Sequence, residues 1–403
     1  MSNDTQPEIR FPGFTEDWEQ HKLIEVARYR NGKAHEQAID ESGKYIVVNS
    51  KFVSTNGRVK KYTNIIIDPL KKNELAFVLS DVPNGKAIAR TFLVDKEHRY
   101  SLNQRIAGIT PHKDTDSYFL NVLMNRNPYF LKFDNGVGQT NLTKADVENF
   151  IGHYPSYEEQ QKIGTFFKQL DDTIALHQRK LDLLKEQKKG YLQKMFPKNG
   201  AKVPELRFAG FADDWEERKL GELGKTQSGI GFPDAEQGGS EGIPFFKVSD
   251  MNNIGNEYEM RNANHYVSNE QIERKKWKPI KDVPAIIFAK VGAAIMLNRK
   301  RLVTSPFLID NNTMAYLFNN TWDIYFGKIL FETINLPRYS QVGALPSYNS
   351  SDIENISVKV PVKDEQQKIG TFFKQLDDTI ALHQRKLDLL KETKKGFLQK
   401  MFV

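Results

Sequence analysis

Residues 159–196 read EQQKIGTFFKQLDDTIALHQRKLDLLKEQKKGYLQKMF, and residues 365–402 repeat this stretch without a gap. Only Thr393, in place of Gln187, and Phe397, in place of Tyr191, differ. A second repeat opens each half of the chain: PEIRFPGFTEDWEQHKL at residues 7–23 returns as PELRFAGFADDWEERKL at residues 204–220. The segments between these repeats resemble each other only faintly. The chain therefore holds two divergent inserts in a near-identical framework.

Apolar residues in the long repeat recur at alternating steps of four and three, the heptad pattern of a coiled-coil seam. The residues between them are mostly charged or amide side chains. His177, Lys188 and their counterparts His383 and Lys394 interrupt the seam, and we interpret them as edge or register residues rather than ligands. The predicted seam residues are Ile163, Phe167, Leu170, Ile174, Leu181 and Leu184 in the first copy, and Ile369, Phe373, Leu376, Ile380, Leu387 and Leu390 in the second.

Each copy is long enough for a helix of about 50 Å, at about 1.5 Å per residue. Pro155 and Pro361 precede the two copies, and Pro197 ends the first. A single helix with this apolar stripe needs a partner. We expect the two copies to pair antiparallel, and the alternative is that each helix packs on its own domain. The predicted fold class is α+β: two globular domains joined by two long antiparallel coiled-coil helices, in a pseudo-two-fold repeat.

The two inserts, at about residues 27–156 and 224–362, both have an α+β pattern of short apolar runs and turns. The strand candidates are Tyr45–Val48, Asn64–Ile67 and Leu75–Leu79 in the first insert, and Phe245–Val248, Ala285–Ala289 and Met314–Phe318 in the second. Each insert also contains a late aromatic patch that we expect to be helical, Ser117–Asn125 and Trp322–Ile334.

The composition indicates a cytoplasmic protein with a modest basic excess. The chain has a net charge of +7, a pI of about 9.1 and no cysteine, which excludes a disulfide scaffold and cysteine-based zinc sites. No apolar stretch approaches the length that spans a bilayer. The positive charge is compatible with an acidic polymer as partner but raises the expectation of nucleic acid only slightly.

Basic and amide side chains cluster in the loops of both inserts. Arg and Lys can bind phosphates or guanine edges, and Asn and Gln can bond adenine edges. Any one charged residue is more often a solvated surface residue, but clustering in both inserts favours a DNA-binding surface. The candidates are Lys51, Arg58, Lys60, Lys61, Lys86, Arg90, Gln104, Arg105, Gln139, Thr140 and Asn141 in the first insert, and Lys247, Lys275, Lys276, Lys290, Arg299, Lys300, Arg301, Tyr339, Ser340 and Gln341 in the second.

The sequence offers no catalytic residues and no metal site. It lacks the HExxH zinc motif, the phosphate-binding loop GxxxxGK[ST] and the GxSxG nucleophile elbow. Asn127–Phe130 matches an adenine-methyltransferase signature only in part, and Pro233-Asp234 with Glu273–Lys275 matches a nuclease pattern only loosely. The absence of these motifs is typical of a binding protein whose partner subunits carry out the catalysis.

The chain resembles a known family, the DNA-specificity subunits of type I restriction–modification systems. The resemblance covers nearly the whole chain. It rests on FPGFTEDWEQHKL and FAGFADDWEERKL and on the Pro-x-x-x-Glu-Gln-Gln-Lys-Ile run that enters each long helix. Further matches inside the inserts are Leu102–Arg105, Ile309–Asn312 and Gly343–Ser347, which is similar to a Gly-x-x-x-Pro-Ser pattern but one residue shorter. GVGQTNLT at Gly136–Thr143 departs from this pattern.

The resemblance implies two target-recognition domains, each of which reads one half of a bipartite asymmetric DNA site. The helices would set the half-site spacing and dock two methyltransferase subunits, and two restriction subunits would join them. S-adenosylmethionine, ATP and Mg²⁺ would bind those partners and not this chain. The expected domains are residues 1–158 and 198–362 for recognition, and 159–197 and 363–403 for the helices.

Two other functions stay open from the sequence. One is a coiled-coil adaptor that has no role on DNA. The other is a nuclease or methyltransferase that acts alone. The near identity of the long repeats also fits recent gene duplication, without any functional constraint.

Overall fold

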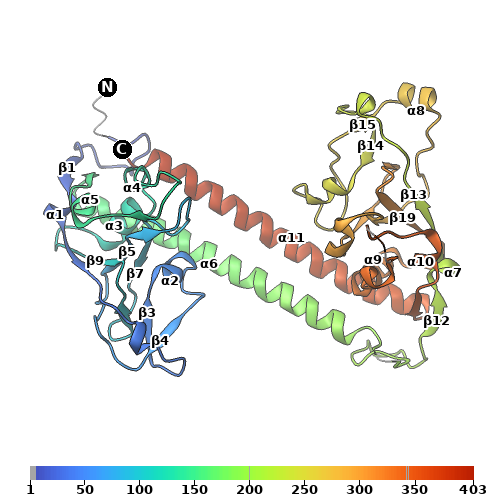
Figure 1. Cartoon of the computed structure of the whole chain (residues 1–403), viewed down its shortest axis with the longest axis horizontal. Helices are drawn as coiled ribbons and strands as arrows, with labels where there is room; N and C mark the ends of the chain where they lie inside the picture. Colours follow the sequence, from blue (N-terminus) through green and yellow to red (C-terminus); the bar gives the residue numbers. More distant parts are fainter. Residues whose placement is uncertain (1–5, 199, 342, 344) are drawn as a thin grey trace. The chain divides into compact units, whose positions relative to one another are not determined.

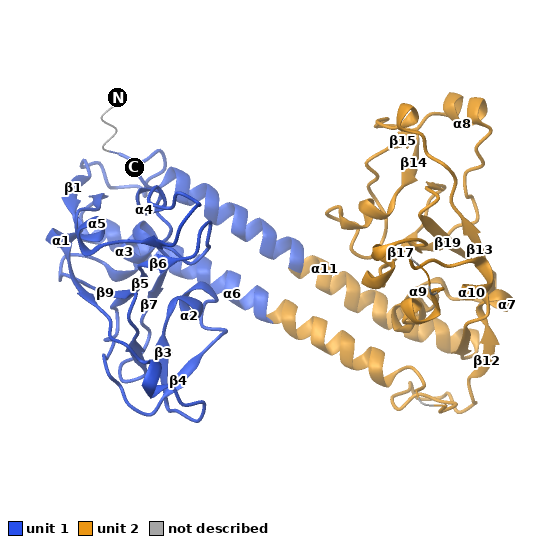
Figure 2. Cartoon of the chain, viewed as in Figure 1, with its two compact units in different colours: residues 1–179, 384–403 blue, residues 180–383 orange. Residues whose placement is uncertain are grey.

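The computed structural model of the chain describes residues 6–198, 200–341, 343 and 345–403. The chain forms two compact units, Met1–Arg179 with Gln384–Val403 and Lys180–His383, coloured separately in Figure 2. Each unit therefore contains one divergent insert and a segment of both long repeats.

The two long repeats form the helices α6 (Tyr157–Lys194) and α11 (Lys363–Lys400), labelled in Figure 1. In the first unit the beginning of α6 lies beside the end of α11, with the ring centroids of Phe166 and Phe397 4.9 Å apart. In the second unit the end of α6 lies beside the beginning of α11, and Tyr191 and Phe372 are also 4.9 Å apart. The helices run antiparallel, as the predicted fold class requires.

Burial along both helices follows the heptad pattern. Leu170, Ile174, Leu184, Leu376 and Leu390 are half-buried. The other predicted seam residues are at most 2% exposed: Ile163, Phe167 and Leu181 on α6, and Ile369, Phe373, Ile380 and Leu387 on α11.

The first unit builds two main sheets from its insert, with strand orders β2-β9-β5-β7 and β4-β3-β8, and two strand pairs, β1-β11 and β6-β10. Its strands are β1 (Glu19–Lys22), β2 (Ala27–Asn31), β3 (Tyr45–Val48), β4 (Lys61–Thr63), β5 (Leu75–Val78), β6 (Ser80–Asp81), β7 (Thr91–Leu93), β8 (Tyr100–Leu102), β9 (Ile106–Pro111), β10 (Thr140–Asn141) and β11 (Ile151–Tyr154). Its shorter helices are α1 (Leu23–Val26), α2 (Ser50–Ser54), α3 (Ser117–Met124), α4 (Pro128–Leu131) and α5 (Lys144–Glu148).

The second unit has equivalent sheets in the same order, β13-β19-β16-β17 and β15-β14-β18, and an equivalent pair β12-β20. Its strands are β12 (Glu216–Lys219), β13 (Gly224–Ser228), β14 (Ile243–Phe246), β15 (Tyr266–Val267), β16 (Ala285–Ala289), β17 (Lys300–Val303), β18 (Leu308–Ile309), β19 (Thr313–Phe318) and β20 (Ser357–Val360). Its shorter helices are α7 (Leu220–Leu223), α8 (Asn269–Lys275), α9 (Ile324–Thr333) and α10 (Ser350–Glu354), with 3-10 turns η3 (Val248–Asn252), η4 (Ala293–Leu297) and η5 (Leu336–Tyr339). The divergent inserts thus share one topology.

Two strand predictions need correction. Asn64–Ile67 is a turn, because the Thr63 hydroxyl bonds the backbone N–H and C=O of Ile65 and so competes with strand pairing. The strand predicted at Phe245–Val248 ends at Phe246. Val248 begins η3, where the Asp250 carboxylate accepts from the Lys247 N–H at 2.9 Å.

The short repeats at residues 7–23 and 204–220 contact the long helices in equivalent ways in their own units. Arg10 forms two bonds of 2.8 Å to the buried Glu159 carboxylate, and Arg207 forms two of 2.7 Å to Glu365. The Ile9 N–H donates to the carbonyl of Lys400 in the first unit. The equivalent bond in the second unit runs from Leu206 to Lys194, also at 2.8 Å. The side-chain contact uses Arg and Glu in both units, and the backbone contact is made at equivalent positions.

The start of each long helix is shaped to receive a short helix of the insert. Asp116 caps α3 through the Phe119 N–H at 2.8 Å, and Gln160 of α6 accepts from the Asp116 N–H at 3.0 Å. Asp323 and Gln366 make the equivalent contacts at α9. A Cβ atom at Gly164 would lie 2.4 Å from Asp116 Oδ1, so glycine permits the close approach. None of the helices in the described part of the chain combines the length and the apolar character needed to span a bilayer.

Candidate nucleic-acid interface

In the first unit, one end of the main sheet gathers several of the predicted DNA-binding residues. Asn141 pairs with Ser80 across β10 and β6, and Gln139 donates to the Ser80 hydroxyl at 2.6 Å. The Leu79 N–H donates to the carbonyl of Arg105, which places Arg105 beside the same strand end. Gln139, Asn141 and Arg105 are exposed. This strand end therefore presents amide and guanidinium groups, which suit base edges and phosphates.

The connection from β6 to β7, beside this strand end, is held in a fixed shape. The Asp81 carboxylate accepts from the N–H groups of Ala87 at 2.5 Å and Ile88 at 3.0 Å. Lys86 is exposed on this connection, but Arg90 is half-buried and donates to the carbonyl of Lys86 at 2.5 Å. Burial and the neighbouring Arg126 charge lower the pKa of Arg90. Of these two cationic residues, Lys86 is therefore the more accessible to a ligand.

The other predicted residues of the first unit lie on different elements. Thr140 is buried in β10. Gln104 is exposed and donates to the Glu36 carboxylate. A further exposed basic group extends from α2 to β4 and consists of Lys51, Arg58, Lys60 and Lys61.

The second unit has an equivalent strand end beyond β16. Ser347 bridges Val291 and Gln341, and the Gly292 N–H donates to the carbonyl of Pro346 at 2.8 Å. Gln341 and Tyr339 are exposed, Ser340 is half-buried, and Lys290 and Arg299 flank the connection from β16 to β17. In the motif Gly343–Ser347 and the run before it, Ala344 and Val342 lie outside the described residues.

Two predicted DNA-binding residues of β17 turn inward. Lys300 Nζ donates to the carbonyl of Ile334 at 2.6 Å and to Asn298 at 3.0 Å. Burial lowers the pKa of Lys300 to about 8. Arg301 donates to the carbonyl of Met251, and burial lowers its pKa as well. Neither side chain is free to meet a phosphate in this arrangement.

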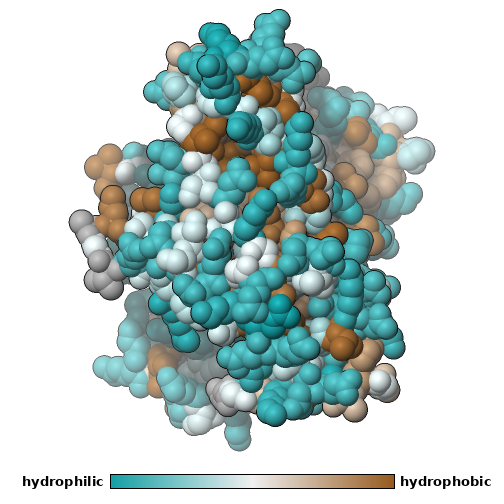
Figure 3. All heavy atoms as spheres, turned by 90° about the vertical axis from the view of Figure 1, so that its right-hand side faces the viewer, coloured by the Kyte–Doolittle hydropathy of each residue, from teal (hydrophilic) through white to brown (hydrophobic). Residues whose placement is uncertain are grey.

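The remaining candidates of the second unit are partly engaged with neighbours. Lys247 Nζ donates to Gln237 at 2.7 Å. Lys275 pairs with Glu236 at 3.1 Å, and Lys276 ends α8 in the left-handed conformation. On the face drawn in Figure 3, hydrophilic side chains predominate and apolar ones form small separate patches.

A buried ionic cluster, which the sequence reasoning missed, ties α9 to both long helices in the second unit. Asp377 of α11 is 2.8 Å from Lys188 of α6 and 2.5 Å from Lys328 of α9, and it accepts from the Tyr325 hydroxyl at 3.0 Å. Glu332 pairs with Lys188 at 2.7 Å. Burial alone would raise the pKa of Asp377, but the two ammonium groups outweigh burial and hold this pKa below its ordinary value.

The equivalent place in the first unit is simpler. Asp171 meets Lys394 at 2.5 Å and the Tyr118 hydroxyl at 3.0 Å. Asn121 stands where the second unit has Lys328, and its buried Oδ1 has no partner among the described residues. The lysines that interrupt the seam, Lys188 and Lys394, indicated a polar site in both units, whereas the asymmetry itself comes from Asn121 in one insert and Lys328 in the other.

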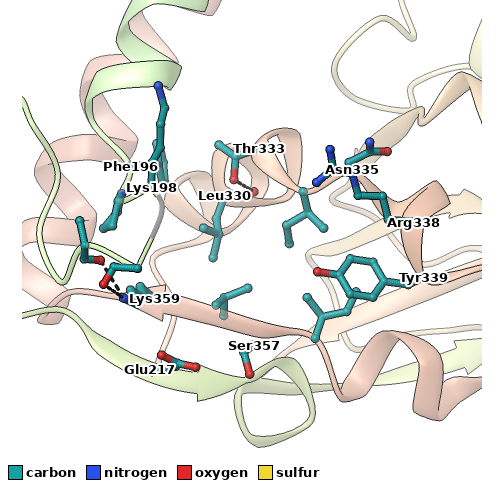
Figure 4. Close-up of a pocket in the computed structure, with 16 residues that line it drawn as sticks. Phe196, Lys198, Glu217, Leu330, Thr333, Asn335, Arg338, Tyr339, Ser357 and Lys359 are labelled. Atoms are coloured by element: carbon teal, nitrogen blue, oxygen red, sulfur yellow. Dashed lines mark hydrogen bonds between the residues drawn. The ribbon is translucent and has the colours of Figure 1, made fainter.

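A cavity of about 400 Å³ lies in the second unit where α6 ends, between β20, α9 and η5 (Figure 4). Leu330 and Val358 are among its apolar lining residues, and Arg338 and Tyr339 line one side. The ammonium group of Lys359 donates to the carbonyls of Gly200 and Ala201, drawn as dashed lines. The Lys359 charge therefore holds the chain that leaves α6. Within the described residues, no group of three or more His, Asp or Glu side chains could hold a metal ion.

Comparisons with known proteins agree on one family. A family model described as the type I restriction modification DNA specificity domain matches residues 15–186 and 212–392. The type I restriction enzyme MjaVIII specificity subunit of Methanocaldococcus jannaschii is 23% identical over 412 residues, covering 95% of this chain and 91% of that protein. The putative MjaX specificity subunit of the same organism is 21% identical, covering 95% and 92%.

Solved structures support the fold. The crystal structure of a type I restriction–modification S subunit from M. genitalium superposes with a TM-score of 0.71 at 16% identity, covering 99% of both chains. A second structure, from work on complex assembly of a type I restriction–modification system, gives a TM-score of 0.51 at 16% identity, covering 98% of this chain and 99% of that one. Since the family model matches most of the chain, this protein belongs to the type I restriction–modification DNA-specificity subunits.

Proposed function

We propose that the two inserts of this specificity subunit read the two halves of a bipartite, asymmetric DNA site, with residues 1–158 and 198–362 as the recognition domains. The observation that carries the proposal is the combination of equal topology and unequal loops. Both inserts use the same strand order, yet the residues at equivalent strand ends differ, with Gln139 and Asn141 in one and Leu345 and Ser347 in the other. Equal scaffolds with different side chains suit two different half-sites.

The proposed DNA contacts are the exposed polar residues at these strand ends, together with the basic group on α2 and β4. Lysines such as Lys60 and Lys61 would bind phosphates and supply affinity. Gln139, Asn141 and Gln341 can bond base edges and supply sequence discrimination. Replacement of a phosphate-binding lysine should weaken binding to all sequences alike, whereas Gln139→Ala should relax one position of the site.

The long helices, residues 159–197 and 363–403, are proposed to dock two identical methyltransferase subunits. Leu176 and Leu183 are 60% and 59% exposed on α6, and their repeat equivalents Leu382 and Leu389 are 44% and 68% exposed on α11. An apolar side chain that lies outside the seam and repeats in both copies fits a partner that is present twice. Serine at these four positions should abolish co-purification with the methyltransferase, whereas methionine should preserve it.

We further propose that two restriction subunits join this assembly in the cytoplasm. S-adenosylmethionine would bind the methyltransferase, and ATP and Mg²⁺ would serve the partner subunits. The purified chain alone should neither methylate nor cleave DNA in the presence of these compounds. Activity without partners would favour an enzyme that acts alone, and negligible DNA affinity at low salt with the methyltransferase present would favour a coiled-coil adaptor.

The helices are also proposed to set the gap between the half-sites. Duplication of Ile174–Lys180 and Ile380–Lys386 adds one heptad to each helix and keeps the seam in phase. Each helix lengthens by about 10.5 Å, and at about 3.4 Å per base pair the gap should widen by about three base pairs. A seven-residue insertion after Gly200, outside the helices, is the matched control and should leave the gap unchanged. An unchanged gap in the heptad variant would show that the length of the helices does not set the distance between the half-sites.

Independence of the two readers is tested by domain exchange. Replacement of residues 27–156 with the corresponding insert of another specificity subunit should change one half of the methylated motif and leave the other half intact. A change in both halves would contradict two independent readers.

A further inference from the structure

The connection between β16 and β17 holds two adjacent apolar side chains out in solvent. Met296 is 59% exposed and Leu297 is 58% exposed, and both belong to the 3-10 turn η4. Single exposed apolar residues are ordinary on protein surfaces. An exposed pair at the tip of a turn is a more specific feature, because it offers a small apolar edge for insertion into a partner.

The turn that carries this pair is fixed at both ends. Ile295 is buried beneath it, at 2% exposure. Before the turn, the Gly292 N–H donates to the carbonyl of Pro346 at 2.8 Å. After it, Asn298 accepts from the Leu336 N–H at 3.1 Å and donates to the carbonyl of Ile334 at 3.3 Å. The exposure of Met296 and Leu297 is therefore imposed by the fold.

Three cationic residues lie on the segments that adjoin this turn. Lys290 precedes the turn, Arg299 follows it, and Arg338 lies on η5, which Asn298 joins to the turn. Arg299 donates to the Asn252 amide oxygen, so this bond leaves its charge unneutralised. An apolar tip beside cationic residues has the chemistry of a side chain that enters the base stack while its neighbours hold phosphates.

The first unit differs at the equivalent connection. The residues between β5 and β7 present Val82, which is 64% exposed, next to Pro83. Valine is a shorter side chain than methionine or leucine and reaches less far from the backbone. The two halves therefore differ in their capacity to separate stacked bases.

We propose that Met296 and Leu297 form a wedge that enters the minor groove of the half-site read by residues 198–362, opens one base step and bends the DNA. This inference rests on the proposed function of that insert as a DNA reader. Apolar wedges of this kind unstack one step and kink a duplex by about 20–90°. The second half-site would then be selected partly by how easily its sequence deforms.

The test uses the complete chain assembled with its methyltransferase subunits and a duplex of about four helical turns. The duplex carries the site identified by methylation mapping, with dyes at its ends to report bending by energy transfer. The same site with 2-aminopurine at single positions reports unstacking. Four complexes are compared: wild type, Met296→Ala with Leu297→Ala, the conservative exchange Met296→Leu with Leu297→Met, and the control Ile254→Ala, whose side chain is 91% exposed in the same unit.

The wild type, the conservative exchange and the control should bend the duplex and raise 2-aminopurine fluorescence at one step. The double alanine variant should lose both signals and bind its specific site about ten-fold more weakly, with non-specific affinity retained. An unchanged bend in the double alanine variant overturns the wedge. So does loss of methyltransferase binding before DNA is added, because the tip would then contact protein. A wild-type complex that fails to bind the mapped site overturns the proposed function itself, which is a separate result.

Discussion

Replacement of Asp377 with asparagine should destabilise the second unit far more than the same change at Asp171 destabilises the first. The Asp377 side chain is 2% exposed and lies 2.8 Å from Lys188 and 2.5 Å from Lys328. Asparagine keeps the shape and can still accept from Tyr325, but it leaves two buried ammonium groups with only Glu332 as counter-charge.

The magnitude follows from burial. Loss of one partner from a buried ion pair costs about 3–5 kcal/mol, and the remaining Glu332 places our expectation near the lower limit, at about 3 kcal/mol. Asp171 and Lys394 are 31% and 23% exposed and form a single pair, so Asp171→Asn should cost about 1 kcal/mol or less. Each variant differs from the wild type only by the exchange of one carboxylate oxygen for an amide nitrogen, so each serves as the control for the other.

The assay is urea unfolding of the purified chain, with hydrogen exchange of α9 and α3 to locate the change. The two ammonium groups hold the pKa of Asp377 below its ordinary value of 3.8, so its stabilising charge is present at neutral pH. That contribution is lost only as pH falls through the lowered pKa. The difference from wild type should therefore be constant between neutral pH and about pH 5 and shrink in stronger acid. Equal losses at Asp377 and Asp171 would refute this reasoning.

Three further predictions concern stability and can use the same unfolding assay. Gly370→Ala should destabilise the chain by about 2 kcal/mol, because its Cβ would lie 2.2 Å from Asp323 Oδ1. Gly396→Ala, whose Cβ would have nothing within 4 Å, should stabilise the chain by about 0.5–1 kcal/mol. Similar effects at both sites would contradict the close packing of α9 against the start of α11. Glu365→Gln should cost about 3 kcal/mol, because Arg207 loses a buried carboxylate that accepts two bonds, and a neutral effect would mean that the pair adds nothing. Lys300→Met should stabilise the chain by up to about 3 kcal/mol at pH 7, because folding lowers the pKa of Lys300 from 10.5 to about 8. Because the pKa of Lys300 falls from 10.5 to about 8 on folding, the stability of the wild type rises between those pH values. The advantage of Lys300→Met over the wild type should therefore vanish near pH 10.5. An advantage that persists above pH 10.5 would show that it does not come from the buried charge.

The long helices could be predicted from sequence because their determinants are local. The steps of four and three fix which face of each helix is apolar, and α6 and α11 carry that face as expected. Strands such as Tyr45–Val48 and Ala285–Ala289 were also found from local composition, and both are present with these bounds.

The sheet orders were not accessible in the same way. β3 pairs in parallel with β8, far along the chain, and no local pattern specifies that neighbour. The cluster around Asp377 combines residues from α6, α9 and α11, so its members carry no common sequence signal. Lys300 and Arg301 looked like a surface charge run, but the strand β17 and the turn before it direct both side chains inward.

The central claim is that two different readers on one repeated frame select a DNA site in two parts. Genome-wide methylation mapping of a host that expresses this chain with its methyltransferase tests it most directly. The account predicts one methylated motif made of two unlike specific blocks separated by a gap of fixed length, absent when this chain is absent. A single continuous motif, or a methylation pattern unchanged by removal of this chain, would contradict it.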